Sequence, residues 1–556
     1  MEMKTNLNKR NITMKEMKSN VFAFCLAAGM LALTACSNED STEADKEATQ
    51  TVRFSITEED FGTDTELTRA GMQGIKPATA ELSDCEVEVS AENEPAEKMA
   101  APTRAVTTPV HYTIRAYQSG ALKCELKGTF SASSFTPDGG SPASIQLARN
   151  QTYDFVCFND QVTPNGNKLE VSLADAATAR IGHQQVTIGT TDQTVSLSSK
   201  HAGVRMRTQF TAKKDIPTAI SATLQSTGND IPTRVSYDPA TGTYTSLSSG
   251  AVAATTNNSP ASAEAKFTAS NYGQAYSYTS TGKYHYFLPT TDMSHFKLNV
   301  TGGTIFWKPL SGTINKLSGS SVQATANSTY LIKAKMKPQY TYLMSDGTTG
   351  FFKETTYGGG TKTPIAVVLD TGQRIAMALT DANAGGTLVW CTNAYWTTQT
   401  NVITQPAAQS LTTYARSGRE ETWNPVYSTG GIGVKAVNPI FASFHAAGHY
   451  NPGVAYTGSP ALVWYLPSYH DWKLAFSVLG FGNASAVTNS GNYTWYGYLA
   501  GGSYIQVGGS GGDEWYWTSS AISISGSGTL GFFGNRMGWD SAAKSYHCAV
   551  RPFVAY

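Results

Sequence analysis

Two residue patterns in the chain have spacings known from catalytic sites. His445 and His449 are four residues apart, the spacing at which two imidazoles on one helix face bind zinc. However, Gly448 lies between them and the glutamate of the H-E-x-x-H motif is missing. The segment Gly508-Gly-Ser-Gly-Gly512 fits the G-x-S-x-G pattern of nucleophilic serines only because it is rich in glycine, and no strand-to-helix turn surrounds it. We therefore expect no catalytic residue, no metal and no cofactor, and predict that the protein is not an enzyme.

The first forty residues predict covalent lipid chemistry. A basic stretch is followed by an apolar run from Val21 to Leu33, which is too short for a bilayer that needs about 20 residues, so residues 1–35 are expected to be a secretory signal peptide. Leu33-Thr-Ala-Cys36 resembles the bacterial lipobox, which implies cleavage and diacylation of Cys36. Two acyl chains give stable membrane anchoring. Ser37-Asn-Glu-Asp40 resembles the signal that sends lipoproteins of Bacteroidetes to the outer leaflet of the outer membrane, although a flexible tether would also be polar.

The remaining cysteines leave two possibilities open. An oxidising cell envelope would allow one disulfide between Cys124 and Cys157 and another between Cys391 and Cys548. Free buried thiols are the alternative, and the sequence does not decide between them.

Charge and composition predict an exported, mainly β protein. Lys plus Arg and Asp plus Glu are both 41, so no global field favours nucleic acid. Between Ser37 and Arg104 there are 17 acidic and 6 basic residues, which predicts an acidic leader at residues 36–104. The rest is rich in Thr, Ser, Gly, Tyr and Val and lacks long helical periodicity.

Alternating strands and a shift in tryptophan content divide the chain into domains. Thr51–Thr57 alternates as a strand, and Val110–Tyr117 with the turn at Gln118-Ser-Gly120 predicts a hairpin. A second set of strands runs to Lys337, and nine of the ten tryptophans follow Pro338. We expect β domains at residues 105–210 and 211–337 and a separate domain at residues 338–556.

The part from residue 50 to residue 337 resembles the fimbrillin family of Bacteroidetes pilins. The resemblance rests on the strand and turn Tyr112-Thr-Ile-Arg-Ala-Tyr-Gln-Ser-Gly120 and on the strand Tyr153-Asp-Phe-Val-Cys-Phe-Asn159, together with the order of lipobox, acidic leader and arginine site. It implies two tandem β-sandwich domains. It also implies that a trypsin-like protease cuts after an arginine of the leader, and that a neighbouring subunit then fills the exposed groove with one of its strands.

Two arginines fit the cleavage site that this resemblance implies. Arg69 and Arg104 are each preceded by Thr and followed by Ala. Arg69 follows the strand that would be removed, whereas a cut at Arg104 would remove the whole leader, so Arg104 is favoured as the mature boundary. An arginine in an unprocessed exposed loop is the alternative at either position.

The part from residue 340 to residue 556 resembles the C-type-lectin-like fold shared with formylglycine-generating-enzyme-like proteins. Three motifs carry this resemblance in the family's order: Trp464-Tyr-Leu-Pro-Ser-Tyr-His-Asp-Trp472, Tyr516-Trp-Thr-Ser-Ser520 and Val550-Arg-Pro-Phe-Val554. It implies an α+β domain. The cysteine motif of the oxidase members and the calcium-binding sets of lectins do not occur in this segment, so neither chemistry is implied.

The same segment suggests a binding surface. A short helix is expected at Leu474–Leu479, and the glycine-rich segments Gly501–Gly512 and Gly526–Gly534 are expected to be exposed loops. Aromatic rings bind sugar faces and protein hot spots at little entropic cost. The tentative ligand-binding residues are Trp495, Tyr496, Tyr498, Tyr504 and Trp539, and the alternative is that they pack in the domain's own core.

Together these resemblances predict a pilus tip subunit and adhesin. Its partners would be stalk pilins, bound by strand exchange, and a host or microbial surface glycan or protein. It would be lipid-anchored in the outer membrane before maturation and extracellular on the pilus afterwards. The alternative is a surface-anchored lipoprotein that binds a glycan or protein and never polymerises.

Overall fold

The structure describes the chain from just before the first predicted strand. The computed structural model describes residues 48–62, 76–83, 85–93, 103–105, 108–131, 134–262, 275–306, 308–392, 417–428, 431–480, 487–494, 497–534 and 536–556. The predicted signal peptide, Cys36 and Arg69 lie outside these residues. The part from Thr49 to Tyr556 forms one compact unit. None of the helices described within it is long and apolar enough to cross a bilayer.

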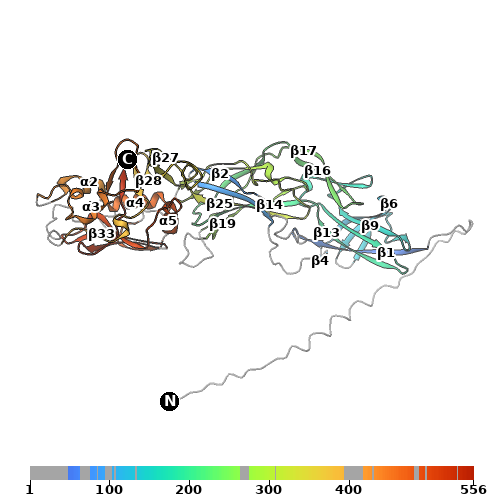
Figure 1. The fold of residues 1–556 in the computed structure, drawn as a ribbon. Coiled ribbons are helices and arrows are strands. Elements are labelled where there is room, and N and C mark those ends of the chain that lie inside the picture. Colours follow the sequence, from blue (N-terminus) through green and yellow to red (C-terminus); the bar gives the residue numbers. More distant parts are fainter. Residues whose placement is uncertain are drawn as a thin grey trace, which may run out of the picture. The chain divides into compact units, whose positions relative to one another are not determined.

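The first sheet is built around the strand predicted at Thr51–Thr57. That strand is β1, and the predicted hairpin is β5 with β6, joined through Ser119 and Gly120 at positive φ. Both predictions are confirmed. In pairing order the strands are β4 (Thr103–Ala105), β1 (Thr49–Glu59), β13 (Gln193–His201), β12 (Arg180–Thr187), β9 (Thr152–Asn159), β5 (Val110–Gln118), β6 (Ala121–Ser131) and β7 (Ser134–Pro137), with β8 (Ile145–Ala148) also pairing with β1 (Figure 1).

The next two sheets enclose the second core. Its largest sheet runs β19 (Tyr278–Thr281), β14 (Val204–Ala212), β25 (Thr329–Pro338), β3 (Cys85–Asn93) and β2 (Ala78–Leu82), with β20 (His285–Phe287) also on β14. The other runs β18 (Thr255–Thr256), β15 (Ser221–Ser226), β21 (Phe296–Gly302) and β24 (Gly312–Ile314), and a small ribbon pairs β22 (Thr304–Ile305) with β23 (Lys308–Pro309).

One predicted boundary needs correction. The boundary between residues 210 and 211 falls inside β14, which is buried in the second core through Val204, Met206 and Phe210. A further sheet joins strands from both predicted domains, in the order β10 (Thr163–Asn165), β11 (Lys168–Ser172), β16 (Ile231–Asp238) and β17 (Thr243–Gly250). The predicted leader contains the predicted strand at Thr51–Thr57, β1, in the first sheet and also supplies β2 and β3, which were not predicted, to the largest sheet of the second core.

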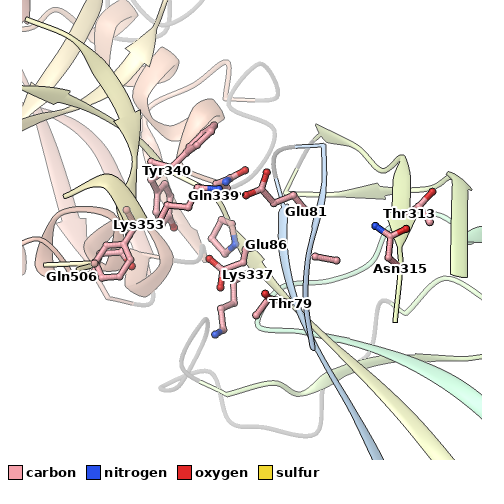
Figure 2. Close-up of a pocket in the computed structure, with 15 residues that line it drawn as sticks. Thr79, Glu81, Glu86, Thr313, Asn315, Lys337, Gln339, Tyr340, Lys353 and Gln506 are labelled. Carbon is pink, nitrogen blue, oxygen red and sulfur yellow. Dashed lines mark hydrogen bonds and ion pairs between the residues drawn. The ribbon is translucent and has the colours of Figure 1, made fainter. Parts of the chain in front are cut away.

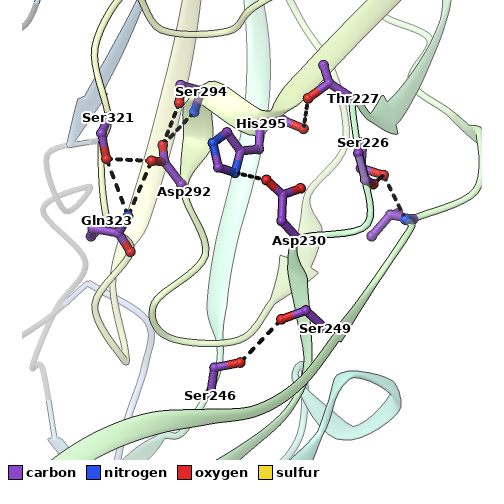
Figure 3. A network of polar contacts seen from close by, with 12 residues as sticks. Ser226, Thr227, Asp230, Ser246, Ser249, Asp292, Ser294, His295, Ser321 and Gln323 are labelled. Carbon is purple, nitrogen blue, oxygen red and sulfur yellow. Dashed lines mark hydrogen bonds and ion pairs between the residues drawn. The ribbon is translucent and has the colours of Figure 1, made fainter.

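Asp292 fixes two loops of the second core (Figure 3). Its carboxylate accepts hydrogen bonds from the backbone N–H of Ser294 at 2.9 Å and of Val322 at 3.1 Å, and from the Ser321 hydroxyl. Burial alone would raise the pKa of Asp292, but these donors hold it below its ordinary value. The carboxylate therefore stays charged and ties the loop before β21 to the loop before β25.

The C-terminal part combines sheets with short helices, so the chain is mainly β with a small helical portion. One sheet runs β27 (Thr349–Phe351), β26 (Thr341–Met344), β28 (Pro364–Asp370), β29 (Ile375–Ala378), β35 (Phe553–Ala555) and β30 (Val463–Tyr465). The other runs β31 (Gly491–Thr494), β34 (Arg536–Ala543), β33 (Gly526–Phe533) and β32 (Glu514–Ala521). The helices are α2 (Gly418–Trp423), α3 (Ala442–Gly448), α4 (Tyr469–Val478) and α5 (Gly497–Ile505).

The helix predicted after Pro467 is confirmed as α4. Ser468 and Asp471 form a capping box at its N-terminus, and Gly480 has a φ of 78° just beyond its C-terminal end. Trp472 and Phe476 point from α4 into the core and stack with their ring centroids 5.5 Å apart.

Of the two segments predicted as glycine-rich loops, one is a strand and the other is helical only at its start. Gly526–Phe533 is β33, and α5 (Gly497–Ile505) includes the first five residues of Gly501–Gly512, whereas residues 506–512 form the predicted loop. In β33 the glycines make room for neighbouring rings: a Cβ at Gly528 would lie 2.5 Å from the Tyr469 ring, and one at Gly531 would lie 3.1 Å from the Trp515 ring. The glycines there permit close packing rather than chain flexibility.

The four cysteines considered for disulfides are not bonded to one another. Cys124 is half-buried, whereas Cys157, Cys391 and Cys548 are buried. Burial raises the pKa of Cys391 to about 11 and that of Cys548 to about 12, so both stay protonated at neutral pH. Neither of the two disulfides that the sequence allows is present in the structure.

Candidate functional site

The candidate site is the place that β1 occupies in the first sheet. On one side β1 runs parallel to β13, from Val52 opposite Gln193 to Glu58 opposite Ser199. On its other side the first part of β1 pairs with β8 and the last part with β4, both antiparallel. Since β1 lies between partners, its removal would leave unpaired backbone donors and acceptors on both sides of an open slot.

Side chains of β1 fill this slot with a two-residue period. Val52 is fully buried, Ile56 is 7% exposed, and both join a core that contains Phe155 and Leu197. Phe54, on the same face, is half-buried with its ring centroid 5.5 Å from that of Phe155. Each fully buried aliphatic side chain contributes about 1.5–3 kcal/mol, so a strand that replaced β1 would need apolar side chains at the same spacing.

Polar contacts hold the C-terminal end of β1. The Tyr112 hydroxyl donates to Glu58 Oε1 at 2.7 Å, and Arg180 Nη1 donates to the backbone oxygen of Glu59 at 2.9 Å. The Ser198 hydroxyl also donates to the Glu59 carboxylate. Burial raises the pKa of the Tyr112 hydroxyl well above its ordinary value, so it remains a donor. These contacts fix the register of the strand in the slot.

Just beyond β1, Phe61 anchors the chain against the junction of β13 and β14. Its ring stacks on the His201 ring with centroids 3.7 Å apart, and the Arg205 guanidinium lies 5.1 Å from its centroid. Burial, and then the charges of Arg180 and Arg205, lower the pKa of His201 to about 3. The anchor therefore requires a neutral histidine.

Acidification is expected to loosen this anchor. Because the folded-state pKa of His201 lies below the unfolded value near 6.5, its contribution to stability is complete above about pH 6.5 and is lost as the pH falls towards 3. Between pH 7 and pH 4.5 we expect the free energy of unfolding of the first sheet to fall by about 2–3 kcal/mol more in the wild type than in His201→Phe. The phenylalanine keeps the stack with Phe61 but does not titrate. Hydrogen exchange of the β13 amides, compared between the two proteins at pH 4.5 and at pH 7, measures this difference. Equal protection at both pH values would contradict it.

Of the two candidate cleavage sites, only Arg104 lies among the described residues. It is the middle residue of β4, and its backbone pairs with Glu58 of β1 at the edge of the sheet. A protease that binds its substrate as an extended chain must first detach this three-residue strand. Arg69 and its flanking residues lie outside the residues that the structure describes.

The predicted aromatic binding surface is only partly matched. Tyr504 is 1% exposed and Trp539 is fully buried, and both pack in the C-terminal core with Phe532. As ligand-binding residues these two predictions were wrong, because α5 and β34 turn their rings inwards. Tyr498 is 38% exposed on α5, whereas Trp495 and Tyr496 lie outside the described residues.

The two histidines of the H-x-x-x-H pair, His445 and His449, lie side by side at the end of α3. The rings of His445 and His449 stack with centroids 4.2 Å apart. In the part of the chain that the structure describes, no group of three His, Cys, Asp or Glu side chains is placed to hold a metal.

The last strand of the chain is enclosed by its neighbours. β35 lies between β29 and β30, with Ala376 and Trp464 both opposite Val554. Phe553 and Val554 are fully buried. The C-terminal strand therefore cannot leave without dismantling its own sheet.

Sequence reasoning missed the hairpin formed by β2 and β3. The alternation in Cys85-Glu-Val-Glu-Val89 is a strand pattern and was the available signal, but the acidic composition of the segment obscured it. This hairpin belongs to the second core, although its residues precede the first domain in the sequence.

Solved structures of fimbrial proteins are among those similar to this chain. No protein-family model and no curated protein matches the sequence. A fimbrial protein from Bacteroides ovatus is 9% identical, with 92% of this chain and 100% of that chain covered and a TM-score of 0.24. A fimbrial protein from Bacteroides vulgatus is 14% identical, covering 43% and 90%, with a TM-score of 0.24. The fimbrial anchor protein Mfa2 from Porphyromonas gingivalis is 11% identical, covering 46% and 78%, with a TM-score of 0.21. These values do not place the chain in a family, so its function is inferred from its own strand pairing.

Proposed function

We propose that the protein is a fimbrial subunit that accepts a strand from a neighbouring subunit in the slot now filled by β1. The observation that carries the proposal is the position of β1, an N-terminal strand inserted between β13 on one side and β8 and β4 on the other. Cleavage after Arg69 or Arg104 would separate β1 from the rest of the chain. A donor strand would then regain the backbone hydrogen bonds and fill the positions of Val52 and Ile56.

The enclosed C-terminal strand supports a position at the tip. A subunit inside a fibre must both accept a strand and donate one. Here β35 is paired on both sides and buried, so this strand is not available for donation. An accepting slot combined with an enclosed β35 suits the last subunit of a fibre.

The contacts among the C-terminal motifs support an adhesin of C-type-lectin-like fold. Trp464 of the first motif pairs with Val554 of the third, and Tyr516 of the second forms a bridge with Ala549. The three segments that resemble that fold thus meet around one core. Tyr498 and Ile505, 38% and 59% exposed and two turns apart on α5, are the described residues that we assign to a ligand surface for a glycan or protein.

Lipidation of Cys36 and export to the outer membrane complete the proposal. The lipid would hold the precursor at the cell surface, and cleavage would release the mature chain to join stalk pilins. The second candidate is an anchored lipoprotein that binds its ligand without cleavage or polymerisation. The pairing of β4 with β1 around Arg104 favours this candidate, because it holds the cleavage site in a sheet as long as no protease acts.

Strand exchange after cleavage is the test. The purified precursor is treated with an Arg-specific protease, and the new N-terminus is identified by mass spectrometry. A labelled peptide with the sequence of β1 is then added in excess. We expect cut protein to bind it and uncut protein not to, because only the cut chain can release its own β1. A matched peptide with Val52→Asp and Ile56→Asp is expected not to bind.

Variants separate the two cleavage sites and the two functions. Arg69→Ala and Arg104→Ala each leave one site, and the double variant is the uncleaved control. Cut protein that binds the β1 peptide and then a stalk pilin supports the tip subunit. Absence of cleavage, or a cut chain that binds neither peptide nor pilin, supports the anchored lipoprotein instead.

A further inference from the structure

The hairpin of β2 and β3 is a second N-terminal insert, held in a different sheet from β1. β3 pairs antiparallel with β25 along its whole length, from Cys85 opposite Pro338 to Asn93 opposite Tyr330. β2 lies outside β3 at the end of that sheet. Between them the two candidate cleavage sites bracket the hairpin, because Arg69 precedes β2 and Arg104 follows β3.

The hairpin supplies part of the second core at one edge of its largest sheet. Cys85, Val87, Val89 and Ala91 are all at most 2% exposed and alternate along β3, and Leu82 of β2 is fully buried. Without the hairpin, the core-facing residues of β25 would lose these contacts along one edge. Such an edge combines apolar side chains with unpaired backbone groups, the combination that captures an added strand.

The opposite face of β3 and β25 is an array of complementary charges. Lys337 Nζ lies 3.1 Å and Lys335 Nζ 3.6 Å from the Glu88 carboxylate, and Glu86 is paired in register with Lys337. Hydrogen bonding to Lys337 lowers the pKa of Glu88, so the carboxylate is charged at neutral pH. An edge of β25 freed of the hairpin would present lysines alternating with apolar residues.

We infer that β25 is a second acceptor edge, and that its occupant is an extended segment of a partner subunit in which apolar and acidic residues alternate. This inference rests on the proposed function, because it requires cleavage of the leader. The position of the cut then determines how many acceptor edges are exposed. A cut after Arg69 frees β1 alone and leaves the hairpin tethered to the mature chain. A cut after Arg104 separates the hairpin as well.

A cavity beside the hairpin extends this acceptor towards the C-terminal part (Figure 2). It has a volume of about 630 Å³, and Thr79, Glu81 and Glu86 of the hairpin line it together with Lys337 and Lys353. Lys353 Nζ lies 2.7 Å from Glu81 Oε1. A partner strand in the place of the hairpin would therefore meet a further lysine, which again favours an acidic segment.

Two labelled peptides test the two acceptors separately. One has the sequence of β1, and the other has the sequence of β3 with Cys85→Ser. Arg104→Ala precursor, cut only after Arg69, is expected to bind the β1 peptide alone. Arg69→Ala precursor, cut only after Arg104, is expected to bind both peptides. Binding of the β3 peptide to neither protein, while the β1 peptide still binds, would overturn the second acceptor and leave the proposed function standing. If neither peptide binds to either protein, both fail.

Charge reversal tests the chemistry of the occupant. A precursor with Lys335→Glu and Lys337→Glu together with Glu86→Lys and Glu88→Lys keeps its internal ion pairs, so it is expected to fold. After cleavage at Arg104 its affinity for the acidic β3 peptide should fall at least about fivefold, since like charges would face each other across the strands. A peptide with lysines at positions 86 and 88 should bind instead. Equal binding of both peptides would overturn the assignment of an acidic partner.

Discussion

Replacing Arg551 with methionine is expected to lower the free energy of unfolding of the C-terminal part by about 3–5 kcal/mol. Arg551 is 1% exposed, and its Nε lies 2.7 Å from Asp381 Oδ1 as an ion pair without hydrogen-bond geometry. It also donates to the backbone oxygens of Ala378 at 3.2 Å and Ser510 at 2.7 Å. The variant would leave the Asp381 side chain, which is 6% exposed, without its cation.

The pH dependence of this variant has a definite sign. Burial raises the pKa of Asp381 and the charge of Arg551 opposes that rise, so removing Arg551 raises the pKa further. A folded-state pKa above the unfolded value costs stability as the pH rises past the unfolded value near 3.9. The loss should therefore be larger at pH 8 than at pH 5.

Urea unfolding followed by tryptophan fluorescence measures the loss. Nine of the ten tryptophans follow Pro338, so the signal reports on the C-terminal part of the intact chain. Asp381→Leu combined with Arg551→Met is the matched control and should recover much of the stability, since no unpaired charge is left buried. A single variant as stable as the wild type at pH 8 would show that the ion pair is not needed.

Truncation of Trp472 to alanine is expected to cost about 3–5 kcal/mol in the same part of the chain. The side chain is fully buried, and its ring centroid lies 5.5 Å from that of Phe476, 5.7 Å from that of Tyr516 and 5.1 Å from that of Phe553. These rings come from α4, β32 and β35, so the cavity would open where three elements meet.

Trp472→Phe is the control for this cavity. Within the described residues the indole N–H of Trp472 has no hydrogen-bond partner, so phenylalanine removes an unsatisfied donor while keeping most of the ring contacts. The loss in the free energy of unfolding should be clearly smaller for Trp472→Phe than for Trp472→Ala. Far-UV circular dichroism during urea unfolding is the suitable measurement, because both variants remove a fluorophore. Equal losses would mean that packing of the ring does not determine the cost.

Local periodicity was enough to predict the strands whose partners are near in sequence. Val110–Tyr117 alternates and its partner follows after a turn with Gly120 at φ 77°, so the hairpin was readable, whereas the register shift between Ala116 and Tyr117 was not. The helix after Pro467 was readable for a similar reason, since Ser468 and Gly480 mark its two ends. Such signals lie within about a dozen residues of one another.

Signals that depend on distant partners were misread. β3 pairs with β25, which lies 247 residues later in the chain by the register of Glu88 with Lys335, and only that pairing explains why an acidic segment forms a strand. The glycines of β33 suggested a loop because the rings of Tyr469 and Trp515, which occupy the space above them, come from other segments. Tyr504 and Trp539 suggested a surface for the same reason: aromatic composition does not say which way a ring points.

The enclosure of β35 between β29 and β30 has a consequence for the numbers of fibres and their length. If the protein occupies the tip, each fibre contains one copy, because β35 is already paired on both sides and is not available to a further subunit. The supply of this protein then sets how many fibres a cell can start. The ratio of stalk pilin to this protein sets the mean fibre length, so lowering its expression alone would give fewer and longer fibres.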